Sequence, residues 1–172
     1  MTDFEFQPHL IGKHVELRPM IEGDFEPLYR VAQDPLIWEQ HPQPNRWQRA
    51  VFETFFRRGI ESGGALVAID RESEKVIGSS RYRMHDDPAM GLEIGWTFLA
   101  RSHWGGVYNG DMKRLMLRHA FGCVDRVVFR IGAENIRSQR AVEKLGGVRT
   151  GIHVDDSGEE SLVYAILRST FM

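Results

Sequence analysis

The sequence predicts an α+β domain, in which helices pack against a mixed β-sheet. Short runs with an apolar residue at every second position alternate along the 172 residues with longer runs whose apolar residues lie three or four apart. The first period is that of a strand and the second that of a helix. A glycine-bearing stretch, 104–110, leads directly into one of the helical runs. Together these observations give the element order β-αα-βββ-α-β-α-ββ, with seven strands and four helices.

Composition restricts the class of protein. Hydrophobic residues make up 42% and charged residues 27% of the chain, which is ordinary for a globular protein, and the length suits a single domain over 1–172. Because the formal net charge is −2, we expect neither nucleic acid nor an anionic membrane as a partner. No apolar run reaches membrane-spanning length, and the only cysteine, Cys123, cannot form an internal disulfide. These features predict a cytoplasmic protein.

The first half of the chain begins with an irregular lead-in, 1–9, and a strand that a proline ends. Asp24 and Asn45 have side chains that accept hydrogen bonds from the first amides of a helix, so we expect them to cap the next two helices. Those helices carry apolar faces that would pack on the sheet. A charged turn then joins the two strands of a predicted hairpin, Ala65–Asp70 and Val76–Met84.

The second half continues with a strand, 92–99, the glycine-bearing turn and a helix that extends to about residue 120. Met112 and Met116 lie on the apolar face of that helix, and Lys113 falls away from it. A further strand and a short helix follow, and two alternating runs predict a closing hairpin. The edge of this hairpin could pair across a two-fold axis, so a homodimer is possible.

The turn from Trp104 to Gly110 is a candidate anion site. Gly105 and Gly106 are free to adopt positive φ, and Asn109 also tolerates it. Such a turn can direct several backbone N–H groups into one hollow, where the positive end of the following helix dipole coincides with them. A phosphate site and a loop that only turns the chain are two equal alternatives for this stretch taken alone. It matches neither GxGxxG nor GK[ST].

Three stretches resemble the GCN5-related N-acetyltransferase (GNAT) superfamily and, within it, the ribosomal-protein N-terminal acetyltransferase-like (RimJ/RimL) branch. They are EIGWTFL, WGGVYNGDMKRLML and ENIRSQRAVEKLGG, and the resemblance extends over about residues 10–168. It implies a mostly antiparallel seven-stranded sheet with about four helices and a central pair of parallel strands, 92–99 and 126–131, that splay apart. It also implies acetyl-CoA as cosubstrate, with its pyrophosphate on the turn and its pantetheine between the splayed strands.

The resemblance also implies which residues bind the cosubstrate. Val107 stands where the family usually has glycine, so either Gly105 and Gly106 take the special conformations or phosphate binding is weakened. Asp111 brings a negative charge near the phosphate, and a favourable charge in the first helical turn is its alternative role. Asn135 could likewise be a helix cap, a ligand of the pantetheine arm, or both. The candidates are Trp96, Phe98, Gly105, Gly106, Val107, Tyr108, Asn109, Gly110, Asp111, Asn135 and Ser138.

Acetyl transfer to an amine needs a group that takes a proton and benefits from a donor to the leaving thiolate. Glu93 is the candidate base, because strict alternation places it beside Gly95 and on the face opposite to Trp96. A structural ion pair is its alternative role. The resemblance places Val142 at the position of the usual tyrosine acid, which leaves Ser138 as the candidate donor. A local hydrogen bond at the helix start is the alternative for Ser138.

These observations predict an acetyl-CoA-dependent N-acetyltransferase that acts by direct transfer in a ternary complex. The acceptor is a primary amine, either a small molecule or a protein N-terminus, and the branch resemblance leans toward the N-terminus. The region 35–58 and the loop 85–88 would shape its pocket. No histidine has metal-ligand spacing, so no metal is expected. The alternatives are a non-catalytic acyl-CoA-binding module, which Val107 and the missing tyrosine favour, and a nucleotide-binding α/β domain.

Overall fold

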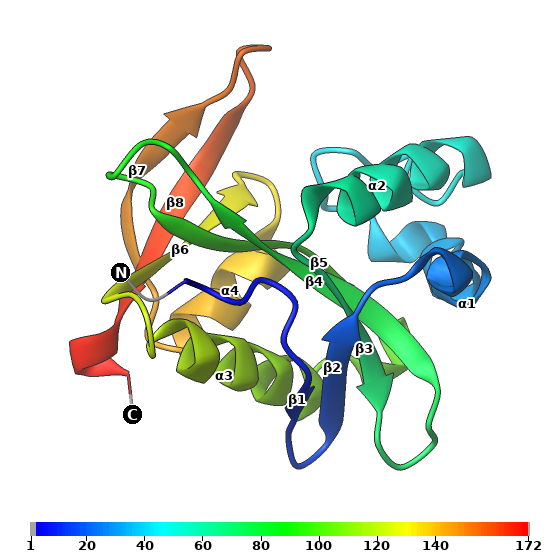
Figure 1. Ribbon diagram of the computed structural model, residues 1–172. Helices are drawn as coiled ribbons and strands as arrows, with labels where there is room; N and C mark the ends of the chain where they lie inside the picture. The colour runs from blue at the N-terminus through cyan, green and yellow to red at the C-terminus, as the bar shows by residue number, and fades with distance from the viewer. Residues whose placement is uncertain (1–2, 172) are drawn as a thin grey trace.

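The computed structural model describes residues 3–171, which form an eight-stranded sheet with helices on both faces (Figure 1). The strands are β1 (Leu10–Ile11), β2 (Val15–Pro19), β3 (Ala65–Asp70), β4 (Val76–Met84), β5 (Leu92–Leu99), β6 (Arg126–Gly132), β7 (Val148–Val154) and β8 (Glu160–Leu167). The α-helices are α1 (Phe25–Ala32), α2 (Arg49–Ser62), α3 (Tyr108–Ala120) and α4 (Ile136–Lys144). The predicted order is confirmed, with β1 as an added edge strand.

The sheet has the strand order β1-β2-β3-β4-β5-β6-β8-β7. All neighbouring strands pair antiparallel except β5 and β6, which pair parallel, so the predicted mixed and mostly antiparallel sheet is confirmed. The eighth strand escaped prediction because two residues are too short to show an alternation.

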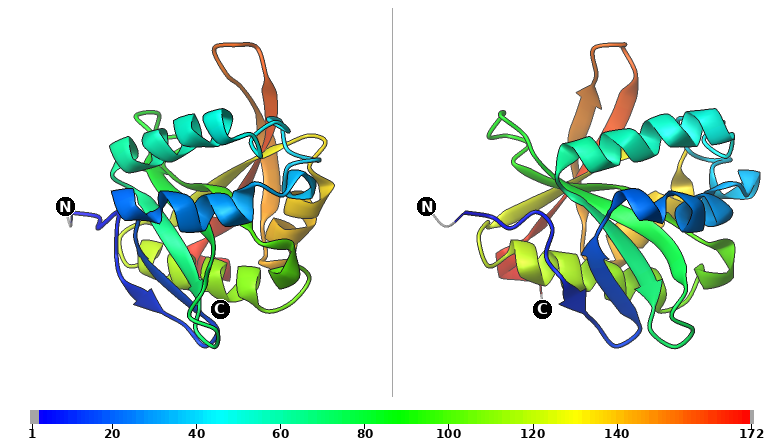
Figure 2. Two further views of the ribbon diagram at one scale, coloured as in Figure 1. Left: turned by 90° about the vertical axis from the view of Figure 1, so that its right-hand side faces the viewer. Right: turned by 45° about the vertical axis from the view of Figure 1, so that its right-hand side comes forward.

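Two layers of helices enclose the sheet, with α1 and α2 on one face and α3 and α4 on the other (Figure 2). Beneath α1 and α2 lies an aromatic core around Trp38, Phe52 and Phe56, all of them buried. Beneath α3 the core is mostly aliphatic and includes Met112 and Met116, both of them buried. The β7–β8 hairpin projects beyond both layers (Figures 1 and 2).

The parallel strands β5 and β6 separate after two residue pairs. Leu92 pairs with Val127 and Glu93 with Val128, and beyond them the strands of the described chain share no further pair. This confirms the predicted splay. The facing edges of the remaining β5 and β6 residues are therefore not paired with each other.

A bulge in β5 accompanies the splay and corrects the predicted face of the strand. Trp96 has a φ of 54°, and the register between β4 and β5 shifts at this point. The extra residue turns Trp96 and Phe98 to the α1–α2 face, whereas Ile94 belongs to the core beneath α3. Glu93 and Trp96 thus face the same side, contrary to the strict alternation expected for a regular strand.

Three further predictions from the sequence need correction. Asp24 does precede α1, but its carboxylate accepts hydrogen bonds from Arg18 and from the backbone N–H of Ile21, and not from the helix. Asn45 does not cap α2, because that helix begins at Arg49 after Gln48. Lys113 does not point away from the core of α3 but is 7% exposed.

The edges and ends of the molecule leave other predictions open. No helix within 3–171 has both the length and the apolar character needed to cross a bilayer. The outermost strand, β7, exposes Val148, Ile152 and Val154, which is compatible with pairing to a second copy. The homodimer, the cytoplasmic location and the single-domain boundary all stay predictions. Of the predicted lead-in 1–9, the structure describes residues 3–9, and the first two residues lie outside the described chain.

Candidate functional site

The turn before α3 presents a row of free backbone donors. Gly105 has a φ of 68°, whereas Val107 lies in the ordinary helical region at φ −85° and ψ −16°. The first alternative for this turn is therefore confirmed for Gly105 and wrong for Gly106, which does not have a positive φ, and Val107 is unstrained. Within 3–171, no protein acceptor is found for the backbone N–H groups of residues 105–110. Six consecutive amides at a helix N-terminus are available to an anion.

Side chains on both sides hold this turn in place. The indole N–H of Trp104 donates to the carbonyl oxygen of Leu99 at 2.9 Å, and the guanidinium of Arg137 stacks 3.7 Å from the centre of the Trp104 ring. On the other side, the Asp111 carboxylate accepts from the backbone N–H groups of His14 at 2.7 Å and Val15 at 2.9 Å. Asp111 is thus an acidic residue in the first turn of α3, as its alternative role predicted, and it also fastens that turn to β2, which was not predicted.

Aromatic candidates near the turn have their side chains engaged in packing. Phe98 is 4% exposed among the aromatic rings beneath α1 and α2, and the Tyr108 ring packs edge-on against His103 at 4.5 Å. Trp96 lies beneath the guanidinium of Arg81, 4.6 Å from it. Contact of these residues with a cosubstrate stays a prediction, and for Phe98 it would involve the backbone.

The start of α4 places Asn135 and Ser138 together. Asn135 is buried, and its Oδ1 accepts from the backbone N–H of Ser138 at 3.3 Å, so the predicted helix cap is confirmed. Its Nδ2 atom remains available as a donor. Within 3–171 the Ser138 hydroxyl has no hydrogen-bond partner. Val142 is buried in the core beneath α3, so an apolar side chain occupies the position of the family's tyrosine.

Glu93 lies where β5 and β6 separate, and two partners hold its carboxylate. Arg130 donates from Nε to Oε1 at 3.0 Å, and Nε2 of His85 lies 2.5 Å from Oε2. Glu93 is only 3% exposed. Gly95 leaves room for the Glu93 carboxylate because it has no side chain: a Cβ at residue 95 would lie 3.2 Å from Oε1 of Glu93. The ion pair proposed as its alternative role is therefore present.

Sequence reasoning did not find the partnership of His85 with Glu93. The second ring nitrogen, Nδ1, has no protein partner within the described chain. In the neutral ring, Nε2–H donates to the carboxylate and leaves the lone pair of Nδ1 free to take a proton. Eight residues and a turn separate the two side chains, so no local spacing rule could connect them.

Lys113 is the second residue that sequence reasoning missed. Its ammonium donates to Thr97 on β5 and to Ser80 on β4, and it lies 5.7 Å from the centre of the Phe129 ring on β6. Burial lowers the pKa of Lys113 to about 7. The residue thus brings a titratable amine to the α3 face of the two splayed strands.

Comparison with known proteins identifies relatives of this arrangement. The model of an acetyltransferase (GNAT) domain matches residues 14–148. Three solved structures illustrate the likeness of fold: a GCN5-related N-acetyltransferase from Brucella melitensis (23% identity, TM-score 0.76, 95% of this chain and 80% of that chain covered), a GNAT acetyltransferase from Bacillus anthracis (16%, 0.78, 94% and 99%), and Mycobacterium smegmatis RimJ in complex with CoA-disulfide (18%, 0.64, 90% and 82%). No curated protein matches the sequence.

Proposed function

The chain belongs to the GNAT acetyltransferase family, and we propose that it transfers an acetyl group from acetyl-CoA directly to a primary amine. One observation carries the proposal: the splayed edges of β5 and β6 lead to six amides, in the turn before α3 and at its start, that have no partner within residues 3–171. A cosubstrate with two amide groups and a diphosphate could use both features, because strand edges pair with amides and helix N-termini bind anions.

The chemistry of the residues present fits acetyl-CoA. The amides of residues 105–110 would hold the diphosphate, and Nδ2 of Asn135 would donate to the pantetheine arm. The edge of β5 next to the Trp96 bulge would pair with the amides of that arm. When bound, acetyl-CoA supplies an activated acyl group, so the protein itself needs no nucleophile.

The pair formed by His85 and Glu93 would take the proton of the acceptor amine. Direct attack requires a neutral amine, and the free Nδ1 of His85 is a suitable acceptor. Glu93 would then act as a positioning residue, since its carboxylate fixes Nε2 of the ring and stabilises the imidazolium that forms. Arg130 holds the same carboxylate at 3.0 Å and so fixes its orientation. Ser138 remains the candidate donor to the leaving thiolate.

Turnover separates this proposal from a non-catalytic acyl-CoA-binding module. Acetyl-CoA is incubated with a panel of primary amines, and free thiol is followed over time. We expect release of CoA only when an amine is present, with the acetylated amine as the second product in mass spectrometry. Tight binding of acetyl-CoA without turnover on any amine, tested over a broad pH range, would establish the binding module instead.

The positive φ of Gly105 gives a test of the phosphate site. Gly105→Ala is expected to raise the dissociation constant of CoA about 5- to 30-fold, because a side chain in this conformation costs roughly 1–2 kcal/mol. Space is not limiting, as an added Cβ would meet no atom within 4 Å. Gly158→Ala on the β7–β8 turn is the matched control, with a φ of 85° and equally open surroundings. Calorimetric titration should show weakened CoA binding only in the first variant, and equal effects would remove the turn from the site.

A further inference from the structure

Two buried arginines lie beside the candidate site without an acidic partner. Arg46 precedes α2 and Arg81 lies on β4, and each is 8% exposed. Neither forms an ion pair within 3–171, and the Nε atom of each is buried without a hydrogen-bond partner. The Arg46 guanidinium touches Gln43 at 3.1 Å and His41 at 3.4 Å, both of them neutral contacts. Arg81 has no side-chain hydrogen bond within the described residues.

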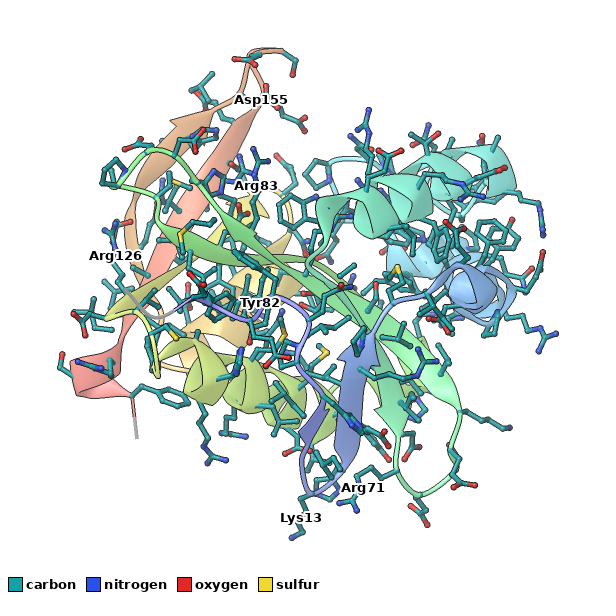
Figure 3. The ribbon with its side chains drawn as sticks, in the orientation of Figure 1. Lys13, Arg71, Tyr82, Arg83, Arg126 and Asp155 are labelled. Atoms are coloured by element: carbon teal, nitrogen blue, oxygen red, sulfur yellow. The ribbon has the colours of Figure 1, made fainter. Side chains whose placement is uncertain are left out.

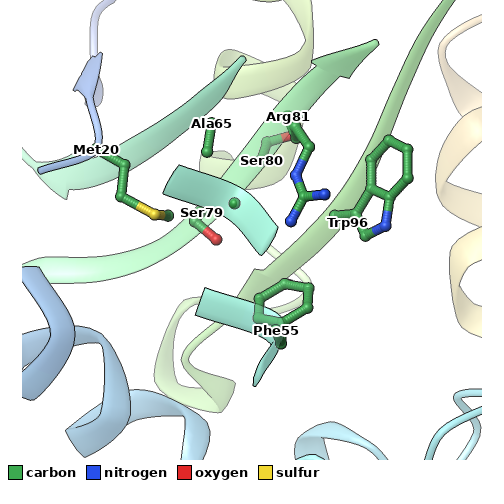
Figure 4. A pocket seen from close by; sticks show the side chains of 8 residues that line it. Met20, Phe55, Ala65, Ser79, Ser80, Arg81 and Trp96 are labelled. Atoms are coloured by element: carbon green, nitrogen blue, oxygen red, sulfur yellow. The ribbon is translucent and has the colours of Figure 1, made fainter. Parts of the chain in front are cut away.

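Aromatic rings hold both guanidinium groups in position. The centre of the Phe55 ring lies 4.4 Å from the guanidinium carbon of Arg46 and 5.7 Å from that of Arg81, so the two groups share one ring. Figure 4 shows the Arg81 guanidinium between Trp96 and Phe55. Stacking of this kind fixes a planar cation while its N–H groups stay free to bind. The two cations are therefore preorganised without being neutralised.

The surroundings add positive charge to this place. Burial and then repulsion from Arg81 and Arg58 lower the pKa of Arg46 to about 10, and burial and then Arg83 lower the pKa of Arg81 to about 10. Both groups are still charged at neutral pH. The carboxylate of Glu93 acts on Arg81 and raises its pKa, but it already binds Arg130 and His85. Unpaired buried charge is costly, so a counter-charge from outside the chain would stabilise the arrangement.

Arg81 lies on the same face of the sheet as Glu93, which belongs to the proposed site of acetyl transfer. Arg81 pairs with Gly95 across the strands and Arg83 with Glu93, so all four face the same side of the sheet. Arg83, which pairs with Glu93, lies two residues from Arg81 along β4. Two residues of a strand span about 6.6 Å, so Arg81 and Glu93 are offset by about this distance along the strands. Arg81, Arg83 and Trp96 also line a cavity of about 390 Å³ together with Phe6, Ser62, Tyr82 and Met84, whereas Arg46 and Glu93 do not line it. Figure 3 shows Arg83 in the space between α2 and the β7–β8 hairpin.

We propose that Arg81 and Arg46 bind an anionic group of the acceptor, so that the substrate is a small amine that carries a carboxylate or a phosphate. This inference rests on the proposed function. The anion would accept hydrogen bonds from the guanidinium groups, and the amine would reach the His85–Glu93 pair about two strand residues away. The cavity that Arg81 lines has a size that suits a small molecule better than a folded partner.

Matched pairs of acceptors test the charge requirement. A series of ω-amino acids is compared with the corresponding ω-amino amides, and phosphoethanolamine with ethanolamine, at equal concentrations of neutral amine. We expect the charged member of a pair to have a kcat/KM about 10- to 100-fold higher, the range that a charge-assisted hydrogen bond gives. The two arms distinguish a carboxylate from a phosphate. Equal use of charged and neutral amines, or clear preference for peptides over every small anionic amine, would overturn the proposal.

Variants assign the preference to the two arginines. Arg81→Met and, separately, Arg46→Met should raise the ratio of KM for the anionic acceptor to KM for the neutral amide about 10- to 100-fold. Arg118→Met, an exposed residue on α3, is the control. Binding of the N-acetylated ω-amino acid, measured by calorimetry, needs no turnover and should weaken to the same extent. Charge-dependent binding without any acetyl transfer would refute the proposed function alone, whereas binding that ignores both charge and arginines would refute this inference alone.

Discussion

Glu93→Gln and His85→Gln are each expected to lower kcat by about 100- to 10,000-fold, the range that loss of a positioned general base gives. His85 is the group with a free ring nitrogen, and Glu93 fixes the opposite nitrogen at 2.5 Å. Loss of His85 therefore removes the proton acceptor, and loss of Glu93 removes the group that orients it. Since the two act as a unit, the double variant should be little worse than either single one.

Rate and thermal stability, measured on the same variants, distinguish catalysis from structural support. In His85→Gln and Glu93→Gln, kcat should fall even at temperatures where both variants remain folded, because the proton acceptor or its orienting partner is lost. Glu26→Gln, which removes the exposed partner of Arg49, is the control for loss of an ion pair and should leave kcat unchanged. If Glu93→Gln lowers only the thermal stability and retains kcat, the ion pair with Arg130 is its whole role.

Patterns along the chain were sufficient for most of the fold. The hairpin Ala65–Asp70 and Val76–Met84 was predicted to the residue, because alternation, a charged turn and flanking glycines all agree. The bulge at Trp96 could not be predicted, since nothing in LEIGWTFL interrupts a regular alternation. It arises where β5 leaves β6 while still paired to β4, which is a tertiary effect. One extra residue then reversed the faces of all the positions after it.

The parts of the candidate site that depend on neighbouring residues were predicted from the sequence. The parts that depend on contacts between distant segments were not. Gly105 and Asn135 serve in a turn and a cap, both of which depend on a few neighbouring residues. The partner of Glu93 and the arginine pair depend on contacts between β4, β5 and the segment before α2, which no spacing in the sequence records. Helical periodicity predicted Lys113 on the exposed side of its helix, because the pattern counts a long cationic side chain as polar. It takes no account of the hydroxyl groups of Ser80 and Thr97 that face this side chain from the sheet.

Lys113→Met should stabilise the folded protein at pH 7 by about 2 to 4 kcal/mol, one of the largest effects of any single substitution in this chain. The pKa of Lys113 is lowered to about 7 from 10.5 by burial. Below pH 7 the folded protein has to hold a buried charge, at a cost of about 1.4 kcal/mol for each pKa unit of difference. Methionine fills similar space without that charge. Ser80 and Thr97 stay satisfied, as their hydroxyls lie 2.8 Å apart.

The sign of the pH dependence follows from the same shift and gives the decisive test. Between about pH 7 and pH 10.5 the unfolded chain holds the proton of Lys113 more tightly than the folded one. Stability of the wild type should therefore rise with pH in this window, by about 2 kcal/mol from pH 7 to pH 9. The rise should be absent in Lys113→Met and intact in Lys75→Met, an exposed lysine beside the β3–β4 turn. Urea unfolding at several pH values measures both, and an equal slope in all three proteins would mean that the Lys113 ammonium is solvated in the folded state.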